Sequence, residues 1–97
     1  MDERQKRAWI ISALRRASLR WPARTEAKKA ARVARNSYRC NACAGLFPNR
    51  EIQMDHITPV GRFLSFDQLC QRMFCDVSGW QAICINCHKD KTRRENK

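Results

Sequence analysis

The chain has 97 residues, enough for one modest domain, and no stretch of it approaches the about 20 consecutive apolar residues that span a membrane. Hydrophobic residues make up 43% of the sequence, but many are alanine or cysteine, so the core must be thin and needs a metal or disulfides. The net charge of +11 is uneven: residues 1–39 contain twelve Lys and Arg against three acidic residues, and residues 40–97 contain eight against six. The first half therefore predicts an anionic partner. We expect a phosphate backbone, with an anionic membrane surface as the alternative.

Two basic helices are predicted for the first third of the chain. Residues 2–20 place apolar side chains, Ile10 and Leu14 among them, at the spacing of a buried stripe, and Pro22 ends this pattern. A second, alanine-rich helix is predicted over residues 23–36. The side chains that we expect to bind DNA phosphates from these helices are Arg15, Arg16, Lys28, Lys29, Arg32 and Arg35. The alternative is a packed helical pair whose basic faces are only solvated.

Short elements are predicted for the rest of the chain. Ile52 and Met54 alternate with polar residues and predict a short strand over residues 52–57, and a second strand is predicted over residues 80–84. An amphipathic helix is predicted between them over residues 63–74. Ser78-Gly79 is expected to turn the chain into the second strand. A polar, basic helix is predicted over residues 87–96.

Two Cys-x-x-Cys pairs predict a structural zinc site. Zn²⁺ prefers four soft ligands in a tetrahedron, and two such pairs supply them in a closed site with no open position for a substrate. We expect no signal peptide and a cytoplasmic protein with reduced thiols, so the pairs indicate metal ligands. The predicted ligands are Cys40, Cys43, Cys84 and Cys87. The alternatives are three disulfides in a secreted protein and reduced thiols without a ligand. Cys70 and Cys75 are expected to act as small buried apolar residues.

The two histidines of the chain mark a second candidate site. Asp55 and His56 stand at the end of the first predicted strand, and His88 directly follows the second cysteine pair. A carboxylate and an imidazole can hold a divalent cation, and a neighbouring imidazole can take a proton from water. The alternative for such a pair is a hydrogen bond with no catalytic role.

Taken together, these motifs resemble those of the zinc-bearing His-Asn-His (HNH) endonucleases, most of all the short versions common in bacteriophage genomes. The resemblance covers roughly residues 38–93 and rests on Cys40-x-x-Cys43, Asp55-His56-Ile57-x-Pro59 and Gln81-x-x-Cys84-x-x-Cys87-His88-x-x-Lys91-Thr92. It implies a ββα-metal (His-Me finger) fold, in which a two-stranded hairpin and a helix hold one catalytic divalent ion. It also implies double-stranded DNA as the substrate.

The resemblance also implies a role for each matching residue. His56 matches the general base that activates water, and Asp55 and His88 match ligands of the catalytic metal, which is Mg²⁺, Mn²⁺ or Ni²⁺. Lys91, in the last predicted helix, is expected to contact DNA. Many relatives carry an asparagine just before the second strand, where this chain has Gly79. If the turn at Gly79 does not require a positive φ, a Gly79→Asn change is expected to be tolerated.

We therefore expect a single α+β domain over residues 1–97, with residues 1–37 as a basic helical arm and residues 38–97 as a zinc-bound ββα-metal core. The expected activity is metal-dependent hydrolysis of DNA phosphodiesters in the cytoplasm, that of the host cell if the chain is phage-encoded. No membrane partner is expected, and other phage proteins are further candidate partners. Two alternatives remain open: a non-catalytic zinc-knuckle module that binds DNA or RNA, and an inhibitor that uses the nuclease fold to bind a protein.

Overall fold

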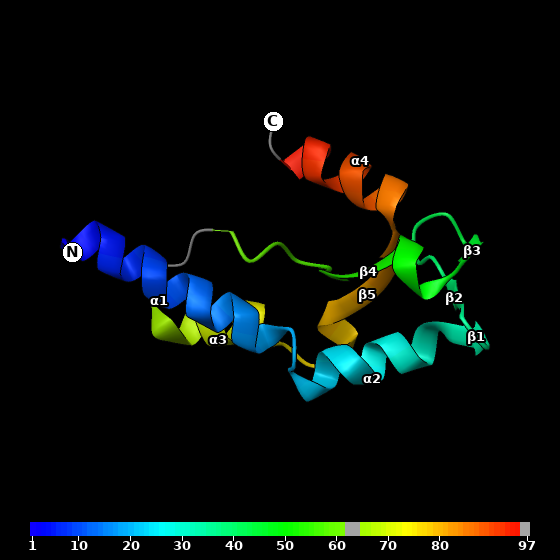
Figure 1. Ribbon diagram of the computed structural model, residues 1–97, viewed down its shortest axis with the longest axis horizontal. Coiled ribbons are helices and arrows are strands. Elements are labelled where there is room, and N and C mark those ends of the chain that lie inside the picture. The colour runs from blue at the N-terminus through cyan, green and yellow to red at the C-terminus, as the bar shows by residue number, and fades with distance from the viewer. Residues whose placement is uncertain (62–64, 96–97) are drawn as a thin grey trace.

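The computed structural model describes residues 1–61 and 65–95, which combine helices with two small antiparallel sheets (Figure 1). The helices are α1 (Glu3–Ser18), α2 (Pro22–Ala31), α3 (Phe66–Met73) and α4 (Ile85–Glu95). The strands are β1 (Arg32–Ala34), β2 (Ser37–Arg39), β3 (Leu46–Phe47), β4 (Ile52–His56) and β5 (Trp80–Cys84). The predicted α+β class is confirmed. None of the helices in the described ranges combines the length and the hydropathy needed to cross a bilayer.

Local sequence signals set the starts of the first two helices. The carboxylate of Asp2 accepts a hydrogen bond from the backbone N–H of Gln5 at 2.8 Å, and the Gln5 side chain accepts one from the Asp2 N–H at 3.0 Å. This reciprocal cap satisfies backbone donors that have no partner inside the helix. Pro22 is the first residue of α2, where its missing N–H costs nothing.

The predicted extent of the second helix is wrong at its C-terminal end. The helix stops at Ala31, and Arg32–Ala34 form strand β1, which pairs with β2. Asn36 adopts a φ of 51°, a conformation that asparagine tolerates better than most residues, and it turns the chain back into β2. Arg32 and Arg35 therefore lie on a strand and in a turn, and not on a helical face.

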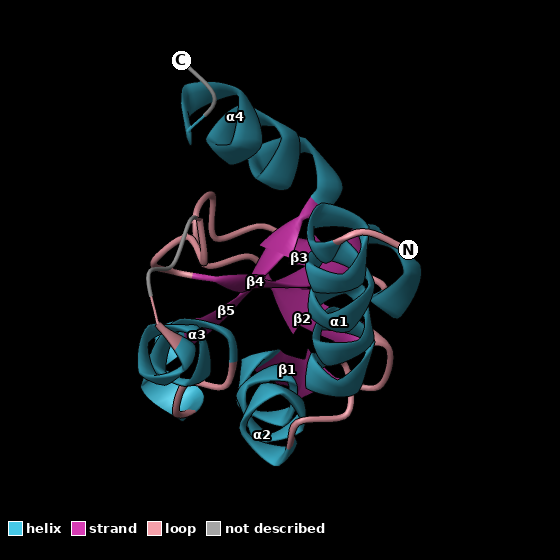
Figure 2. Ribbon diagram, turned by 90° about the vertical axis from the view of Figure 1, so that its left-hand side faces the viewer, coloured by secondary structure: helices cyan, strands magenta, loops and turns pink. Residues whose placement is uncertain are grey.

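The antiparallel pair β4–β5 forms the whole of the second sheet. Both of its strands agree with the prediction to within one residue. Its register places Ile52 opposite Cys84, Asp55 opposite Gln81 and His56 opposite Trp80. Helices α2 and α3 lie on one side of this pair and α4 lies on the other (Figures 1 and 2). Through the segment that contains both histidines the chain runs β4, α3, β5 and α4, so α3 separates the two paired strands in sequence.

The core consists of two small clusters, as the composition predicts. Around β4–β5, Ile52, Ile83 and the neighbouring Ala82 pack with Cys40 and Cys84. A second cluster joins α3 to the loop after β4, and Leu14 of α1 packs against it. The buried members of this second cluster are Val60, Leu69 and Met73.

Two indole groups, one from the turn after α1 and one from the start of β5, bind the same carbonyl in the segment before β5. The Nε1–H of Trp21 donates to the carbonyl of Cys75 at 2.8 Å, and that of Trp80 donates to the same carbonyl at 3.3 Å. The Trp21 ring also packs edge-on against Phe74, with ring centroids 5.6 Å apart. These contacts place the C-terminal half of α1 beside β4–β5.

Candidate active site and metal centre

The two cysteine pairs come from turns that dock on each other. In the first pair, the N–H of Ala44 donates to the carbonyl of Cys40 at 2.9 Å, and Ala44 takes a φ of 63°. The N–H of Asn41 donates to the carbonyl of Ala82 at 2.8 Å, which fixes this turn against β5. The second pair spans the end of β5 and the first turn of α4, because β5 ends at Cys84 and α4 begins with the next residue.

The four sulfur atoms converge at one point. The Sγ atoms of Cys40, Cys43, Cys84 and Cys87 all lie within 4.8 Å of one another, and all six cysteines of the chain are free thiols. A tetrahedron of thiolates around Zn²⁺ has edges of about 3.8 Å, given a Zn–S bond of about 2.3 Å. Small side-chain adjustments bring the sulfurs to that spacing. The cluster could therefore hold a metal ion such as zinc.

The electrostatics of the cluster also favour a cation. Burial opposes ionisation of Cys40, but hydrogen bonds from the backbone N–H groups of Cys43, Cys84 and Ala42 outweigh it and lower the pKa of Cys40 to about 6. The hydrogen bond between the Cys87 and Cys84 sulfurs, with burial, raises the pKa of Cys87 to about 12. Four thiolates this close repel one another, and a divalent ion placed between them offsets half of their charge.

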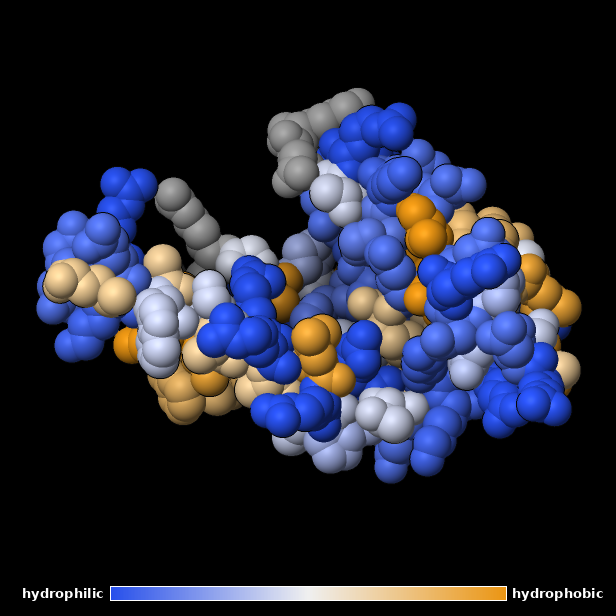
Figure 3. Space-filling view, viewed as in Figure 1, coloured by the Kyte–Doolittle hydropathy of each residue, from blue (hydrophilic) through white to orange (hydrophobic). Residues whose placement is uncertain are grey.

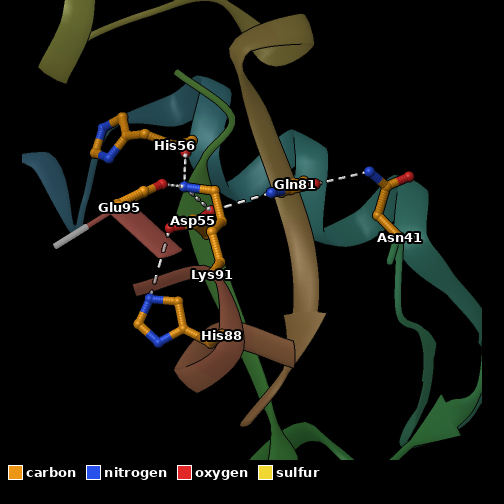
Figure 4. Close-up of polar contacts among 7 residues, drawn as sticks. All are labelled: Asn41, Asp55, His56, Gln81, His88, Lys91 and Glu95. Carbon is orange, nitrogen blue, oxygen red and sulfur yellow. Dashed lines mark hydrogen bonds and ion pairs between the residues drawn. The ribbon is translucent and has the colours of Figure 1, made fainter. Parts of the chain in front are cut away.

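A second group of polar side chains joins β4 to α4 (Figure 4). The Nε2 atom of His88 lies 3.5 Å from Oδ1 of Asp55, whose side chain is only 13% exposed. The other oxygen of Asp55 accepts a hydrogen bond from Nε2 of Gln81 at 3.0 Å. Gln81 in turn accepts one from Nδ2 of Asn41 at 2.7 Å. The carboxylate of Asp55 is therefore oriented by a chain of amides that begins in the first cysteine turn.

Lys91 closes this group from the next turn of α4. Its Nζ lies 3.2 Å from Oδ2 of Asp55, donates to the carbonyl of His56 at 3.2 Å, and pairs with Glu95. Burial works against the charge of Lys91, but the hydrogen bonds and charges of Glu95 and Asp55 outweigh it and raise the pKa of Lys91. The lysine that the sequence analysis assigns to DNA contact thus points its ammonium group toward Asp55.

His56 is held in one orientation by two contacts. Its Nε2 lies 3.0 Å from the carbonyl oxygen of Met73, and its ring packs on Trp80 with centroids 4.0 Å apart. A carbonyl oxygen can only accept, so Nε2 carries a proton in this contact. In the neutral imidazole, Nδ1 then has a free lone pair that can accept a proton.

Asp55, His56 and His88 line two neighbouring cavities of about 430 Å³ and 290 Å³. The larger cavity is also lined by Lys91 and Glu95 of α4, and the surface between α1 and α4 is hollowed and largely hydrophilic (Figure 3). The structure thus brings all three residues with predicted catalytic roles to one cleft.

Of the basic residues predicted to bind DNA from the N-terminal segment, Arg15 alone lines this cleft in the described part of the chain. Those that lie outside it are Arg16, Lys28, Lys29, Arg32 and Arg35. The side chains that reach the site without a predicted role are Asn41, Gln81, Glu95 and Arg24. For Glu95, the helical spacing of four residues from Lys91 is a signal present in the sequence.

Gly79 is constrained by packing, which corrects the expectation that only a positive φ would exclude asparagine there. Its φ lies outside the left-handed region, but a Cβ atom at this position would stand 2.5 Å from Sγ and 2.9 Å from Cβ of Cys75. Cys75 cannot easily move, because its carbonyl accepts both indole hydrogen bonds. Cys70 and Cys75 are only partly buried, which corrects the expectation that both are buried, although the partial burial of Cys75 raises the pKa of its thiol.

We expect Gly79→Asn to destabilise the fold by about 1–3 kcal/mol, the usual cost of forcing extra atoms into a packed site. Urea unfolding of purified protein measures this change. Gly79→Asn combined with Cys75→Gly is the control, compared with Cys75→Gly alone, because removal of the opposing side chain should restore part of the loss. A Gly79→Asn protein as stable as wild type would show that the Cys75 contact is not limiting.

A function for this chain has to be argued from the geometry of its side chains. The side chains concerned are those of Asp55, His56, His88 and the four cysteines. No family model, curated protein or solved structure matches this chain.

Proposed function

We propose that this chain is a metal-dependent endonuclease of the HNH type, which hydrolyses phosphodiester bonds in DNA on a ββα-metal core with one structural zinc. One observation carries the proposal. Oδ1 of Asp55 on β4 and Nε2 of His88 on α4 converge to 3.5 Å, and His56 lines the same cavity. Such a reaction requires a carboxylate and imidazoles as chemical groups, and a polar cleft in which the substrate can reach them.

The proposed catalytic metal fits the Asp55–His88 pair. A carboxylate oxygen and an imidazole nitrogen suit a hard or borderline divalent ion such as Mg²⁺, Mn²⁺ or Ni²⁺. Gln81 holds the second oxygen of Asp55 at 3.0 Å, which leaves Oδ1 directed to His88. When bound, such an ion would neutralise charge on the scissile phosphate and stabilise the departing 3′ oxygen. With only two protein ligands, it should bind weakly and retain several waters.

His56 is the proposed general base. The contact from Nε2 to the Met73 carbonyl leaves Nδ1 as the proton acceptor, and packing on Trp80 fixes the plane of the ring. A general base needs both a fixed direction and a free lone pair. His56 has the environment for both, whereas a pure binding module has no need of either.

The proposed zinc would act on the active site through α4. Cys84 ends β5, Cys87 stands in the first turn of α4 immediately before His88, and Cys40 is fully buried. A metal held by all four cysteines would fix the first turn of α4 relative to β4. It would therefore set the distance between His88 and Asp55.

The chemistry of the reaction products tests the proposal. A labelled DNA duplex incubated with the protein and Mn²⁺ should give fragments with 5′-phosphate and 3′-hydroxyl ends, which a DNA ligase can rejoin. An RNA duplex of the same sequence serves as the comparison substrate. Tight DNA binding with no cleavage in any of the three metals would favour the non-catalytic zinc-knuckle module instead.

Replacing His88 by alanine is expected to abolish cleavage and to lower Mn²⁺ affinity at the cleft by more than 100-fold. Loss of an outer-shell partner alone costs about 10- to 100-fold, and His88 is a proposed ligand. Titration of Mn²⁺ by electron paramagnetic resonance measures the affinity, and elemental analysis should show unchanged zinc. Lys89→Ala, an exposed neighbour on α4, is the control. Normal cleavage by His88→Ala would contradict the assignment of this ligand.

A further inference from the structure

One arginine that lines both cavities of the cleft comes from outside the segment that resembles a nuclease. Arg15 lies on α1 and lines both cavities around Asp55, His56 and His88. The motifs that resemble the HNH enzymes begin only at residue 38, so they give Arg15 no role. Its position results from the way α1 packs.

The backbone at Arg15 is fixed on both sides. Leu14 packs against the cluster formed by α3 and the loop after β4. Ser18 is buried, and its hydroxyl donates to the carbonyl of Arg15 at 2.7 Å. The packed backbone holds the base of the exposed Arg15 side chain at the cleft, so its guanidinium is available there to an anion.

The other cations of the cleft already have acceptors. Lys91 is engaged by Asp55 and Glu95, and Nη1 of Arg24 donates to the carbonyl of Leu19 at 3.1 Å. Within residues 1–61 and 65–95, the structure gives the guanidinium of Arg15 neither an ion pair nor a hydrogen bond. A guanidinium placed beside a cation-binding carboxylate, with no acceptor of its own, is suited to an anion that enters the cleft.

We propose that Arg15 is a catalytic residue that binds the non-bridging oxygens of the scissile phosphate. This inference rests on the proposed nuclease function. In the reaction, the water oxygen bonds to phosphorus while the bond from phosphorus to the 3′ oxygen breaks. The proton of the water passes to His56, and the 3′ oxygen leaves with the bonding pair and takes a proton from solvent. Arg15 forms no covalent bond, and two of its N–H donors stabilise the charge that accumulates on the phosphoryl oxygens.

The experiment separates catalysis from general DNA attraction. Single-turnover cleavage of a DNA duplex is measured at saturating protein with Mn²⁺, and the DNA Kd is measured separately in EDTA. Arg15→Ala should lower the single-turnover rate about 100-fold, as loss of a transition-state donor does elsewhere. It should change the Kd by only a few-fold, and Arg15→Lys should recover part of the rate.

Arg4→Ala is the matched control. Arg4 lies eleven residues earlier on α1, which returns it to the same face about 16 Å along the helix, and it does not line the cleft. Its variant should cleave at the wild-type rate. Arg15→Gln keeps most of the aliphatic stem and decides the matter if Arg15→Ala melts early.

The outcomes distinguish the two proposals. A wild-type protein that does not cleave overturns the nuclease function itself. If the wild type cleaves and Arg15→Ala and Arg15→Gln cleave at the same saturated rate, with or without a weaker Kd, then Arg15 belongs to the general basic surface and the inference is wrong.

Discussion

Replacing Cys84 by serine is expected to unfold the protein and to release its zinc in the same step. Cys84 is 4% exposed and belongs to the core cluster with Ile52 and Ile83, so its loss removes a ligand and disturbs the packing together. A structural zinc contributes on the order of 10–16 kcal/mol of apparent binding free energy. Domains of this size have total stabilities of about 5–15 kcal/mol, so the two small clusters cannot compensate for that loss.

Circular dichroism and elemental analysis measure this effect together. Wild type should contain one zinc per chain, and Cys84→Ser should contain none and lose its helical signal. Cys70→Ser is the control, because Cys70 is a partly buried free thiol on α3, away from the four-cysteine cluster. Its variant should keep the zinc and most of the stability. A reduced, folded wild-type protein without zinc would contradict the assignment.

Replacing His56 by glutamine is expected to lower the cleavage rate by about 10²- to 10⁴-fold, the usual contribution of general-base catalysis. The glutamine amide can still donate to the Met73 carbonyl, as Nε2 of His56 does at 3.0 Å. It has no lone pair that can take a proton from water near neutral pH. The change therefore removes the base and keeps the local hydrogen bond.

Single-turnover kinetics with Mn²⁺ measure the loss, and melting temperature, zinc content and DNA affinity serve as controls. The ring of His56 packs on Trp80, so a modest decrease in melting temperature is expected. Zinc content and DNA affinity should remain close to those of wild type. A His56→Gln protein that cleaves at the wild-type rate would show that another group acts as the base.

The parts of the fold that the sequence predicted well are those with strong local patterns. Strand β4 begins with alternating apolar and polar residues and β5 follows a Ser-Gly turn signal. The two Cys-x-x-Cys pairs have a spacing that few structures other than metal sites require. The sheet β1–β2–β3 was missed because its strands have only two or three residues. Such strands are too short for a period to be visible, and helix propensity extends the alanine-rich pattern through Arg32.

The sequence predicted those site residues that belong to recognisable motifs. Asp55, His56 and His88 could be named because their residue types and spacing suggest chemistry. The position of Arg15 at the cleft and the constraint on Gly79 could not be predicted, since both arise from contacts between segments far apart in the chain. Arg15 reaches the cleft because Leu14 packs on α3, and Gly79 must lack a side chain because Cys75 occupies the space.

Nicking of supercoiled plasmid DNA by the purified, zinc-loaded protein tests the central claim most directly. Relaxed and linear DNA should accumulate with added Mg²⁺, Mn²⁺ or Ni²⁺ and should not accumulate in EDTA. Because only Asp55 and His88 are proposed to hold the catalytic ion, millimolar metal should be needed. His56→Gln, purified in parallel, should leave the plasmid supercoiled, which excludes a contaminating nuclease. A folded wild-type protein that leaves the plasmid intact with all three metals, or that nicks it no faster than His56→Gln, would contradict the account.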